Sequence, residues 1–170
     1  MPGLALERLG HDPATVAALQ GVLEAAPGYF RQASGAPASE SEAERLLTEL
    51  PPGRTPADKE VLGILEAGAL VGCVDLVRGH PDPATVFVGL FLLVERRQGA
   101  GLGRAAWSLV EARLRTLPGL RRLRLAVLRE NPRALSFWRE MGFVPTGETS
   151  PRVEGSVVTE VHLLDKPFVT

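Results

Sequence analysis

The chain has 170 residues, of which 45% are hydrophobic and 23% are charged, and its net charge is −1. This composition is typical of a folded domain, and a chain of this length buries on the order of 70% of its unfolded surface. We therefore expect one domain over residues 1–170. The 19 Lys and Arg residues are balanced by 20 Asp and Glu residues, so no nucleic-acid partner is expected.

The apolar and metal-binding residues exclude further classes. No apolar run approaches the roughly 20 residues of a membrane helix, and the first residues do not resemble a signal peptide. We therefore expect a cytoplasmic protein without a membrane partner. Cys73 is the only cysteine and stands among apolar residues, which predicts a buried thiol, and His11, His80 and His162 are too widely spaced for a metal motif.

Hydrophobic periodicity predicts the elements of the first half of the chain. Ser41 and Glu44 have the spacing of a capping box, so Ser41 is predicted to begin a helix. Short turns between the last three strands of this half predict an antiparallel meander. In order, the segments are strand 5–9, a helix from Asp12-Pro13, a loop over 28–41 rich in Gly, Ala, Ser and Pro, helix 41–50, and strands 59–65, 70–78 and 85–94.

In the second half of the chain, segments with helical spacing of apolar residues are followed by segments in which apolar and polar residues alternate. Asn131 and Pro132 are typical of a helix start, as N-cap and first helical residue, and Gly142 is typical of a helix end. In order, the segments are helix 102–117, strand 123–128, a helix from Pro132 to Met141, and strands 143–149 and 157–164 with a break over 151–156.

A glycine-rich turn joins strand 85–94 to the next helix. Gly99, Gly101 and Gly103 alternate there, which lets the backbone approach a ligand and point its amide hydrogens inward, and the helix N-terminus adds a partial positive charge. Tight packing of a strand against a helix would explain one glycine better than three. The turn therefore predicts a pyrophosphate-binding site.

Two other phosphate motifs compete with this prediction. Gly101, Gly103 and Ala106 fit the loose dinucleotide pattern G-x-G-x-x-A. That motif places its first glycine at a strand end within a parallel βαβ series, whereas the strands before this turn are predicted to be antiparallel. A P-loop is excluded because no Gly-Lys-Ser/Thr follows.

Gln98, Gly101 and Gly103 match the pattern Gln/Arg-x-x-Gly-x-Gly/Ala at every position. This pattern is the signature of the GCN5-related N-acetyltransferase (GNAT) family, which the sequence therefore resembles. The resemblance implies a mixed α/β fold with a mostly antiparallel sheet of about seven strands, splayed between strands 4 and 5 and flanked by about four helices. A second family feature, Asn-x-x-Ala-x-x-Phe-aromatic followed by Gly-Phe, is present as Asn131, Ala134, Phe137, Trp138 and Gly142-Phe143.

The resemblance also implies the reaction, a direct transfer of the acetyl group from acetyl-CoA to a primary amine, without a metal. The cosubstrate would lie where strands 4 and 5 splay apart, with strand backbone pairing with pantetheine and turn amides holding the pyrophosphate. Asn131 also fits a plain N-cap, and Phe137 fits a core position equally well. The implied acetyl-CoA-binding residues are Phe91, Leu92, Leu93, Gln98, Gly99, Ala100, Gly101, Leu102, Gly103, Arg104, Asn131, Ala134 and Phe137.

The catalytic groups depart from the family pattern. Many members carry a Tyr after Phe137 that protonates the leaving sulfur, but here that residue is Trp138, and Tyr29 is the only tyrosine. A thiol has a pKa of roughly 8.5, so a CoA thiolate can leave and be protonated later by water. Some protein N-terminal acetyltransferases carry a Glu where this chain has Ala126, which favours a small-molecule amine as acceptor.

Asp75 is the candidate catalytic residue because alternation places it on a strand face that is otherwise apolar. It would bind or deprotonate the amine. The alternative is a buried structural carboxylate that binds a loop backbone. Glu160 and His162 on the last strand are weaker candidates.

Two other groups of residues have both a structural and a functional interpretation. Tyr29 and Phe30 fit either an apolar wall of the acceptor site or a loop docked on the body. A basic cluster near the end of helix 102–117 fits a solvated surface, with one arginine available for the CoA 3′-phosphate. Its members are Arg113, Arg115, Arg121, Arg122 and Arg124.

We therefore expect an acetyl-CoA-dependent N-acetyltransferase, and the competing class is a non-catalytic acyl-CoA-binding module. Antibiotic, polyamine, amino acid and peptide acceptors all remain compatible with the sequence, as does a homodimer.

Overall fold

A computed structural model describes residues 3–169. All seven strands form one sheet in the order β1-β2-β3-β4-β5-β7-β6, in which the pair β4–β5 is parallel and the others are antiparallel. This confirms the predicted fold class. The strands are β1 (Leu4–Arg8), β2 (Lys59–Glu66), β3 (Ala69–Arg78), β4 (Thr85–Leu93), β5 (Arg122–Leu128), β6 (Val144–Glu154) and β7 (Val157–Pro167), and the helices are α1 (Pro13–Glu24), α2 (Pro27–Ser34), α3 (Glu42–Thr48), α4 (Leu102–Leu114) and α5 (Pro132–Glu140).

Three details differ from the predictions. Helix α2 lies in the segment predicted as a loop. Pro27 begins this helix, the side chains of Phe30 and Ala33 are its buried residues, and Gly35 ends it in the left-handed region. Ser41 precedes α3 but its side chain makes no capping hydrogen bond. Strand β6 runs through Pro151, which is tolerated because β6 lies at the edge of the sheet.

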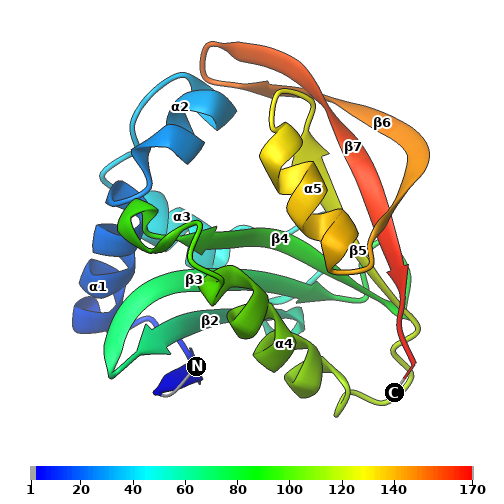
Figure 1. Cartoon of the computed structure of the whole chain (residues 1–170), viewed down its shortest axis with the longest axis horizontal. Coiled ribbons are helices and arrows are strands. Elements are labelled where there is room, and N and C mark those ends of the chain that lie inside the picture. The colour runs from blue at the N-terminus through cyan, green and yellow to red at the C-terminus, as the bar shows by residue number, and fades with distance from the viewer. Residues whose placement is uncertain (1–2, 170) are drawn as a thin grey trace.

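Helices cover both faces of the sheet (Figure 1). Cys73 and Val74 are neighbours on β3 but belong to different apolar clusters, so these clusters lie on opposite faces. The Val74 cluster includes residues of α4 and α5, and the Cys73 cluster includes residues of α1, α2 and α3. No helix within residues 3–169 is both long and apolar enough to cross a membrane.

The sheet opens between β4 and β5. Their parallel pairing runs only from Thr85 with Arg122 to Val88 with Leu125, although β4 continues to Leu93 and β5 to Leu128. Helix α2 and the tip of the β6–β7 hairpin meet above this opening, where the Ser156 amide donates to the Ser34 carbonyl at 3.2 Å (Figure 1). Apart from the Leu93 carbonyl, which accepts from the Gln98 side chain, the edge of β4 beyond Val88 is therefore free to pair with another molecule.

An aromatic cluster holds α4 and α5 beside the opening. The rings of Trp107 and Trp138 pack edge to face with centroids 4.8 Å apart, and Phe91 packs against both. The Trp107 indole N–H donates to Glu111 at 2.8 Å, and Glu111 also pairs with Lys166. Trp138 is thus part of the core.

Substitution of two glycines tests the close packing of β3 against β4. A Cβ at Gly72 on β3 would lie 2.5 Å from the carbonyl oxygen of Leu92 on β4. Gly72→Ala should therefore lower the free energy of unfolding by about 1–3 kcal/mol. Gly21 on α1 has nothing within 4 Å of such a Cβ, so Gly21→Ala should raise it by roughly 0.5–1 kcal/mol. Urea unfolding of both variants measures the two signs, and equal effects would contradict this account.

Candidate active site

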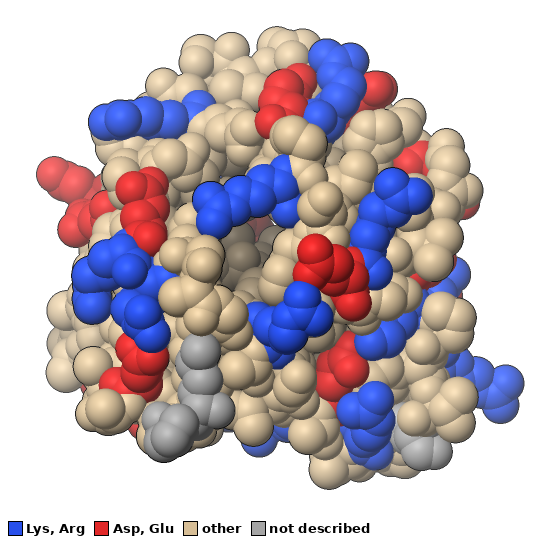
Figure 2. Space-filling view, viewed as in Figure 1, with Lys and Arg blue, Asp and Glu red and all other residues tan. Residues whose placement is uncertain are grey.

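Three cavities meet at the opening of the sheet. The largest, here called the loop groove, has a volume of about 680 Å³ and lies between α2, the end of β4, the glycine turn and α5. Figure 2 shows a hollow at this place with basic side chains at its rim. The residues that line the loop groove are Gly28, Tyr29, Gln32, Phe91, Leu92, Leu93, Glu95, Gln98, Gly99, Gly101, Gly103, Arg104, Asn131, Arg133, Ala134, Ser136, Phe137, Trp138 and Glu140.

The glycine turn has the geometry expected of an anion site. Gly99 and Gly101 have φ angles of +78° and +84°, which side-chain-bearing residues rarely adopt. Within residues 3–169, the backbone amides of residues 99–104 make no hydrogen bond to a protein acceptor. A glycine at position 103 serves packing instead, because a Cβ there would lie 3.4 Å from the Phe137 ring. Two glycines thus shape the turn and the third allows α5 to pack.

Two polar side chains hold this region in place. The Gln98 side-chain amide donates to the Leu93 carbonyl at 2.8 Å, which ties the turn to the end of β4. Asn131 caps α5, its Oδ1 accepting from the Ala134 amide at 3.1 Å, and it also lines the groove. The capping bond uses the oxygen, so the Asn131 amide nitrogen is free for a ligand.

The basic residues of the groove are not those of the predicted cluster. Arg113, Arg115, Arg122 and Arg124 pair with acidic side chains elsewhere, and none of the five cluster arginines lines the groove. Arg104, which pairs with Glu140, and Arg133 line it instead. The Arg133 guanidinium lies 3.3 Å from the place of a Cβ at Gly99. The sequence analysis missed Arg133, although its position two residues after the N-cap Asn131 was a usable signal.

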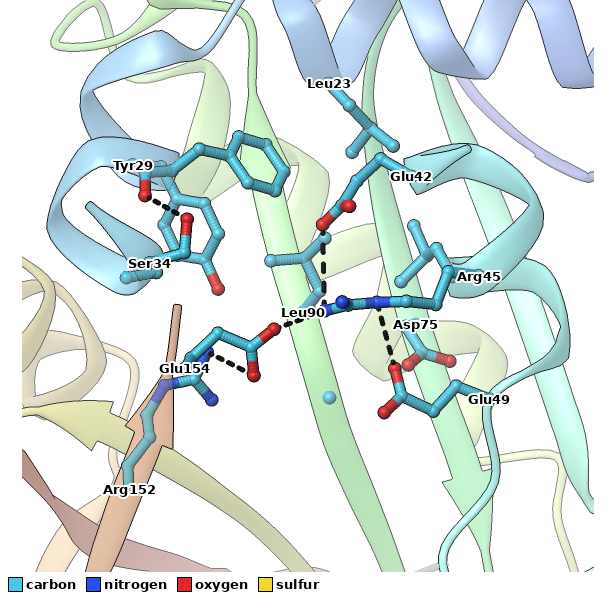
Figure 3. Close-up of a pocket in the computed structure, with 14 residues that line it drawn as sticks. Leu23, Tyr29, Ser34, Glu42, Arg45, Glu49, Asp75, Leu90, Arg152 and Glu154 are labelled. Carbon is cyan, nitrogen blue, oxygen red and sulfur yellow. Dashed lines mark hydrogen bonds and ion pairs between the residues drawn. The ribbon is translucent and has the colours of Figure 1, made fainter. Parts of the chain in front are cut away.

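The second cavity, here called the acidic cavity, has a volume of about 170 Å³. The Arg45 guanidinium crosses it, with nitrogens 2.7 Å from Glu154, 3.6 Å from Glu49 and 3.9 Å from Glu42 (Figure 3). The residues that line it are Leu23, Tyr29, Phe30, Ala33, Ser34, Glu42, Arg45, Leu46, Glu49, Asp75, Gly89, Leu90, Arg152 and Glu154.

Asp75 lies at the wall of the acidic cavity and is paired with Lys59. The Lys59 ammonium is 3.0 Å from Asp75 Oδ1 and donates to the Glu49 carbonyl at 2.7 Å, and the two side chains are only 5% and 10% exposed. Burial raises the pKa of the Asp75 carboxyl, and the charge of Lys59 partly opposes this. The partner is therefore a lysine on β2, whereas the structural alternative predicted a loop backbone.

The sequence analysis also missed Gly89. The pairing of β3 with β4 shifts at this point, from Asp75 opposite Leu90 to Leu76 opposite Val88, so Gly89 is the extra residue of a bulge. A Cβ at Gly89 would lie 2.5 Å from Asp75 Oδ2. The glycine thus makes room for the carboxylate.

The third cavity, here called the splay cavity, has a volume of about 330 Å³ and lies between the separated parts of β4 and β5. Tyr29 lines all three cavities, and Phe30 lines the acidic one and is also buried in the core, so both interpretations of this pair stay open. Glu160 and His162 line none of them, and Glu160 pairs with Arg129 at 3.5 Å.

The Cys73 thiol takes no part in these cavities. It is fully buried, which confirms the prediction of a buried thiol. Burial raises the pKa of this thiol to about 12. No group of three or more His, Cys, Asp or Glu side chains in the described part of the chain is arranged to hold a metal ion.

Comparisons identify the class of protein. A family model described as the acetyltransferase (GNAT) family matches residues 22–143, so the chain belongs to that family. It is an acetyl-CoA-dependent acetyltransferase. A search of curated proteins finds no match.

Solved structures share the fold over nearly the whole chain. An acetyltransferase from Thermus thermophilus is 26% identical with a TM-score of 0.73, covering 98% of this chain and 99% of that one. A spermidine N-acetyltransferase from Vibrio cholerae, solved with CoA and spermine, is 16% identical with a TM-score of 0.73 over 98% and 96%. A GNAT acetyltransferase from Elizabethkingia anophelis with acetyl-CoA bound is 14% identical with a TM-score of 0.65 over 98% and 99%.

Substitution of Gly101 tests the glycine turn. Gly101→Val places a branched side chain at a φ of +84° in the wall of the loop groove, where the turn amides are free to bind an anion. Acetyl-CoA affinity measured by calorimetry should fall at least tenfold, about 1.4 kcal/mol.

Gly119→Val is the matched control for this substitution. Gly119 has a similar φ of +76° but lies in the turn after α4, outside the groove. Its variant should show the same backbone strain and unchanged affinity. Equal affinity losses in the two variants would show that strain alone, and not a blocked ligand, causes the effect.

Proposed function

We propose that this acetyltransferase transfers the acetyl group of acetyl-CoA directly to a primary amine of a small molecule. Residues 1–170 would act as one domain, which their single sheet supports. The observation that carries the proposal is the junction of a groove that ends in an anion-binding turn with a small cavity lined by carboxylates.

Acetyl-CoA would lie along the loop groove. The amides of residues 99–104 and the Arg133 guanidinium face the place of the pyrophosphate, and the free edge of β4 is available to the pantetheine amides. The Asn131 amide nitrogen would bind the same arm. We also propose Arg133, which lines the groove, as a binding residue. The other proposed binding residues are Phe91, Leu92, Leu93, Gln98, Gly99, Ala100, Gly101, Leu102, Gly103, Arg104, Asn131, Ala134 and Phe137.

The acidic cavity would receive the acceptor. Its lining carries the four carboxylates of Glu42, Glu49, Asp75 and Glu154 against two arginines, so it attracts a cationic amine. The Glu42, Glu49 and Glu154 carboxylates already hold one cation, the Arg45 guanidinium, across the cavity. An ammonium group that competes for these partners would enter as Arg45 moves aside.

Asp75 would accept the proton of the amine. An ammonium group is not a nucleophile, so it must lose a proton before its nitrogen forms a bond to the thioester carbon. A carboxylate whose pKa is raised by burial is a stronger base than an exposed one. The nitrogen then displaces the CoA sulfur as the carbon–sulfur bond breaks.

The reaction is tested by the release of free thiol from acetyl-CoA in the presence of a mixed panel of amines. Amine-dependent release, with an acetylated amine detected by mass spectrometry, supports the proposal. Tight binding of acetyl-CoA without release for any amine would favour the non-catalytic acyl-CoA-binding module. A panel of protein N-terminal peptides run beside the small amines tests the preference for small molecules.

Paired substitutions test Asp75. Asp75→Asn should lower turnover by about 10²-fold, and it leaves the Lys59 ammonium buried without its partner, which costs about 3–5 kcal/mol of stability. The double variant Asp75→Asn with Lys59→Met removes both charges and should recover stability without recovering turnover. Recovered turnover in the double variant would limit Asp75 to a structural role.

The pH dependence gives an independent measurement. A protonated Asp75 cannot accept the amine proton, so kcat/KM should fall as the pH decreases through the raised pKa of this carboxyl. The positive charge of Lys59 lowers that pKa, so Lys59→Met should move the acid limb to higher pH. An acid limb that does not move would show that another group is the base.

A further inference from the structure

We infer that Tyr29 is a catalytic residue whose phenol protonates the sulfur of CoA as it leaves. This inference rests on the proposed function. In the step, the amine nitrogen forms its bond to the acetyl carbon, the carbon–sulfur bond breaks with its electron pair on sulfur, and the phenol proton moves to that sulfur. The products are the acetylated amine, the CoA thiol and a tyrosinate, which regains a proton from solvent through the open groove.

The position of Tyr29 is the first argument. Among the described residues it alone lines both the loop groove and the acidic cavity. The thioester of a molecule that lies in the groove must meet an amine from the cavity where the two connect. Tyr29, which lines both, lies at that connection.

The hydrogen bonds around α2 fix Tyr29 at this place. The Gly28 amide donates to Glu95 Oε1 at 2.7 Å, and the Glu95 amide donates to the Ala25 carbonyl at 3.0 Å, so the start of α2 is tied to the end of β4. The Gln32 side chain donates to the Glu130 carbonyl at 2.6 Å, which ties α2 to the other side of the opening. The Tyr29 ring also packs edge to face on Phe30, with centroids 5.1 Å apart.

The phenol is free to act on a ligand. It makes no hydrogen bond to another group within residues 3–169, and Figure 3 shows it pointing into the cavity rather than back into α2. A fixed ring with an unpartnered hydroxyl at a cavity junction is arranged to donate to a bound molecule.

The surrounding charges suit an acid. Burial raises the pKa of Tyr29, so the phenol is protonated at neutral pH. The positive charge of Arg152 lowers this pKa and would stabilise the tyrosinate after proton transfer. The other titratable groups that act on it are Cys73 of β3, Glu42 of α3 and Glu154 of β6. Burial dominates, so Tyr29 still carries its proton when the thioester binds, and Arg152 opposes the loss of acidity that burial causes.

The other side chains at the junction do not fit this role. Trp138 and Asn131 line both the groove and the splay cavity, but an indole and an amide do not release a proton in this pH range. Arg152 lines the acidic and splay cavities and stays charged. Tyr29 is thus the junction side chain that can give its proton to a thiolate.

The first test is Tyr29→Phe, which removes the hydroxyl and keeps the ring. Thiol release at saturating amine should fall by about 10²-fold, the lower end of the effect of a general acid, while the acetyl-CoA dissociation constant and the melting temperature stay unchanged. Thr116→Val removes a hydroxyl beyond the end of α4 and should keep wild-type kcat.

The second test uses the fact that Tyr29 is the only tyrosine in the chain. Biosynthetic incorporation of 3-fluorotyrosine therefore changes this phenol alone and lowers its pKa. The alkaline limb of kcat should move to lower pH in the fluorinated enzyme and should be missing in Tyr29→Phe. Free CoA should shift the fluorine resonance, whereas adenosine 3′,5′-bisphosphate, which lacks the thiol arm, should not.

The outcomes separate the two proposals. The role of Tyr29 is overturned if the wild type is active and the Tyr29→Phe variant is equally active. It is also overturned if the alkaline limb of kcat stays at the same pH in the fluorinated enzyme. Either result leaves the proposed function standing. A wild type that releases no thiol with any amine overturns both.

Discussion

The end of strand pairing between β4 and β5 is the constraint on which the site depends. After Val88 and Leu125 the two strands separate, and the backbone of β4 from Gly89 onward has one paired edge, toward β3, and one open edge. An open edge inside a sheet is costly unless another group pairs with it. The loop groove and the splay cavity both lie along this edge, so the separation of the strands leaves space for an extended ligand beside β4.

The surrounding elements hold the gap open from both sides. On the side of α4 and α5, the aromatic cluster of Trp107 and Trp138 packs against Phe91 of β4 beside the opening. On the other side, α2 is tied to Glu95 and to the Glu130 carbonyl, which lie on opposite sides of the opening. The separation of the strands is therefore supported by packing and hydrogen bonds, and the proposed acid Tyr29 lies on one of the supporting elements, α2.

Much of the fold could be predicted from the sequence because its signals are local. Gly101 can adopt the left-handed backbone of the turn without steric cost, and Asn131 with Pro132 begins a helix through its own hydrogen bond and fixed φ angle. Helix α2 was missed because its Pro, Gly and Ser residues are typical of loops, and only contacts with α1, α3 and the sheet give Phe30 a buried environment. The pairing of Asp75 with Lys59 was missed for a similar reason, since a partner across strands depends on register rather than spacing. The ion pairs of the arginine cluster were not predicted, because three of the acidic partners, Glu60, Asp82 and Asp165, are distant in sequence.

The position of the two tryptophans has an optical consequence. Trp107 and Trp138 are the only tryptophans in the chain, their rings lie edge to face in one cluster, and Trp138 also forms part of the groove wall. The near-ultraviolet emission and circular dichroism of the whole protein therefore come mainly from one place, beside the junction of the cavities. A ligand in the groove changes the surroundings of one member of an excitonically coupled pair. The folded enzyme thus carries its own spectroscopic reporter, and occupancy of the groove can be followed without attaching a dye.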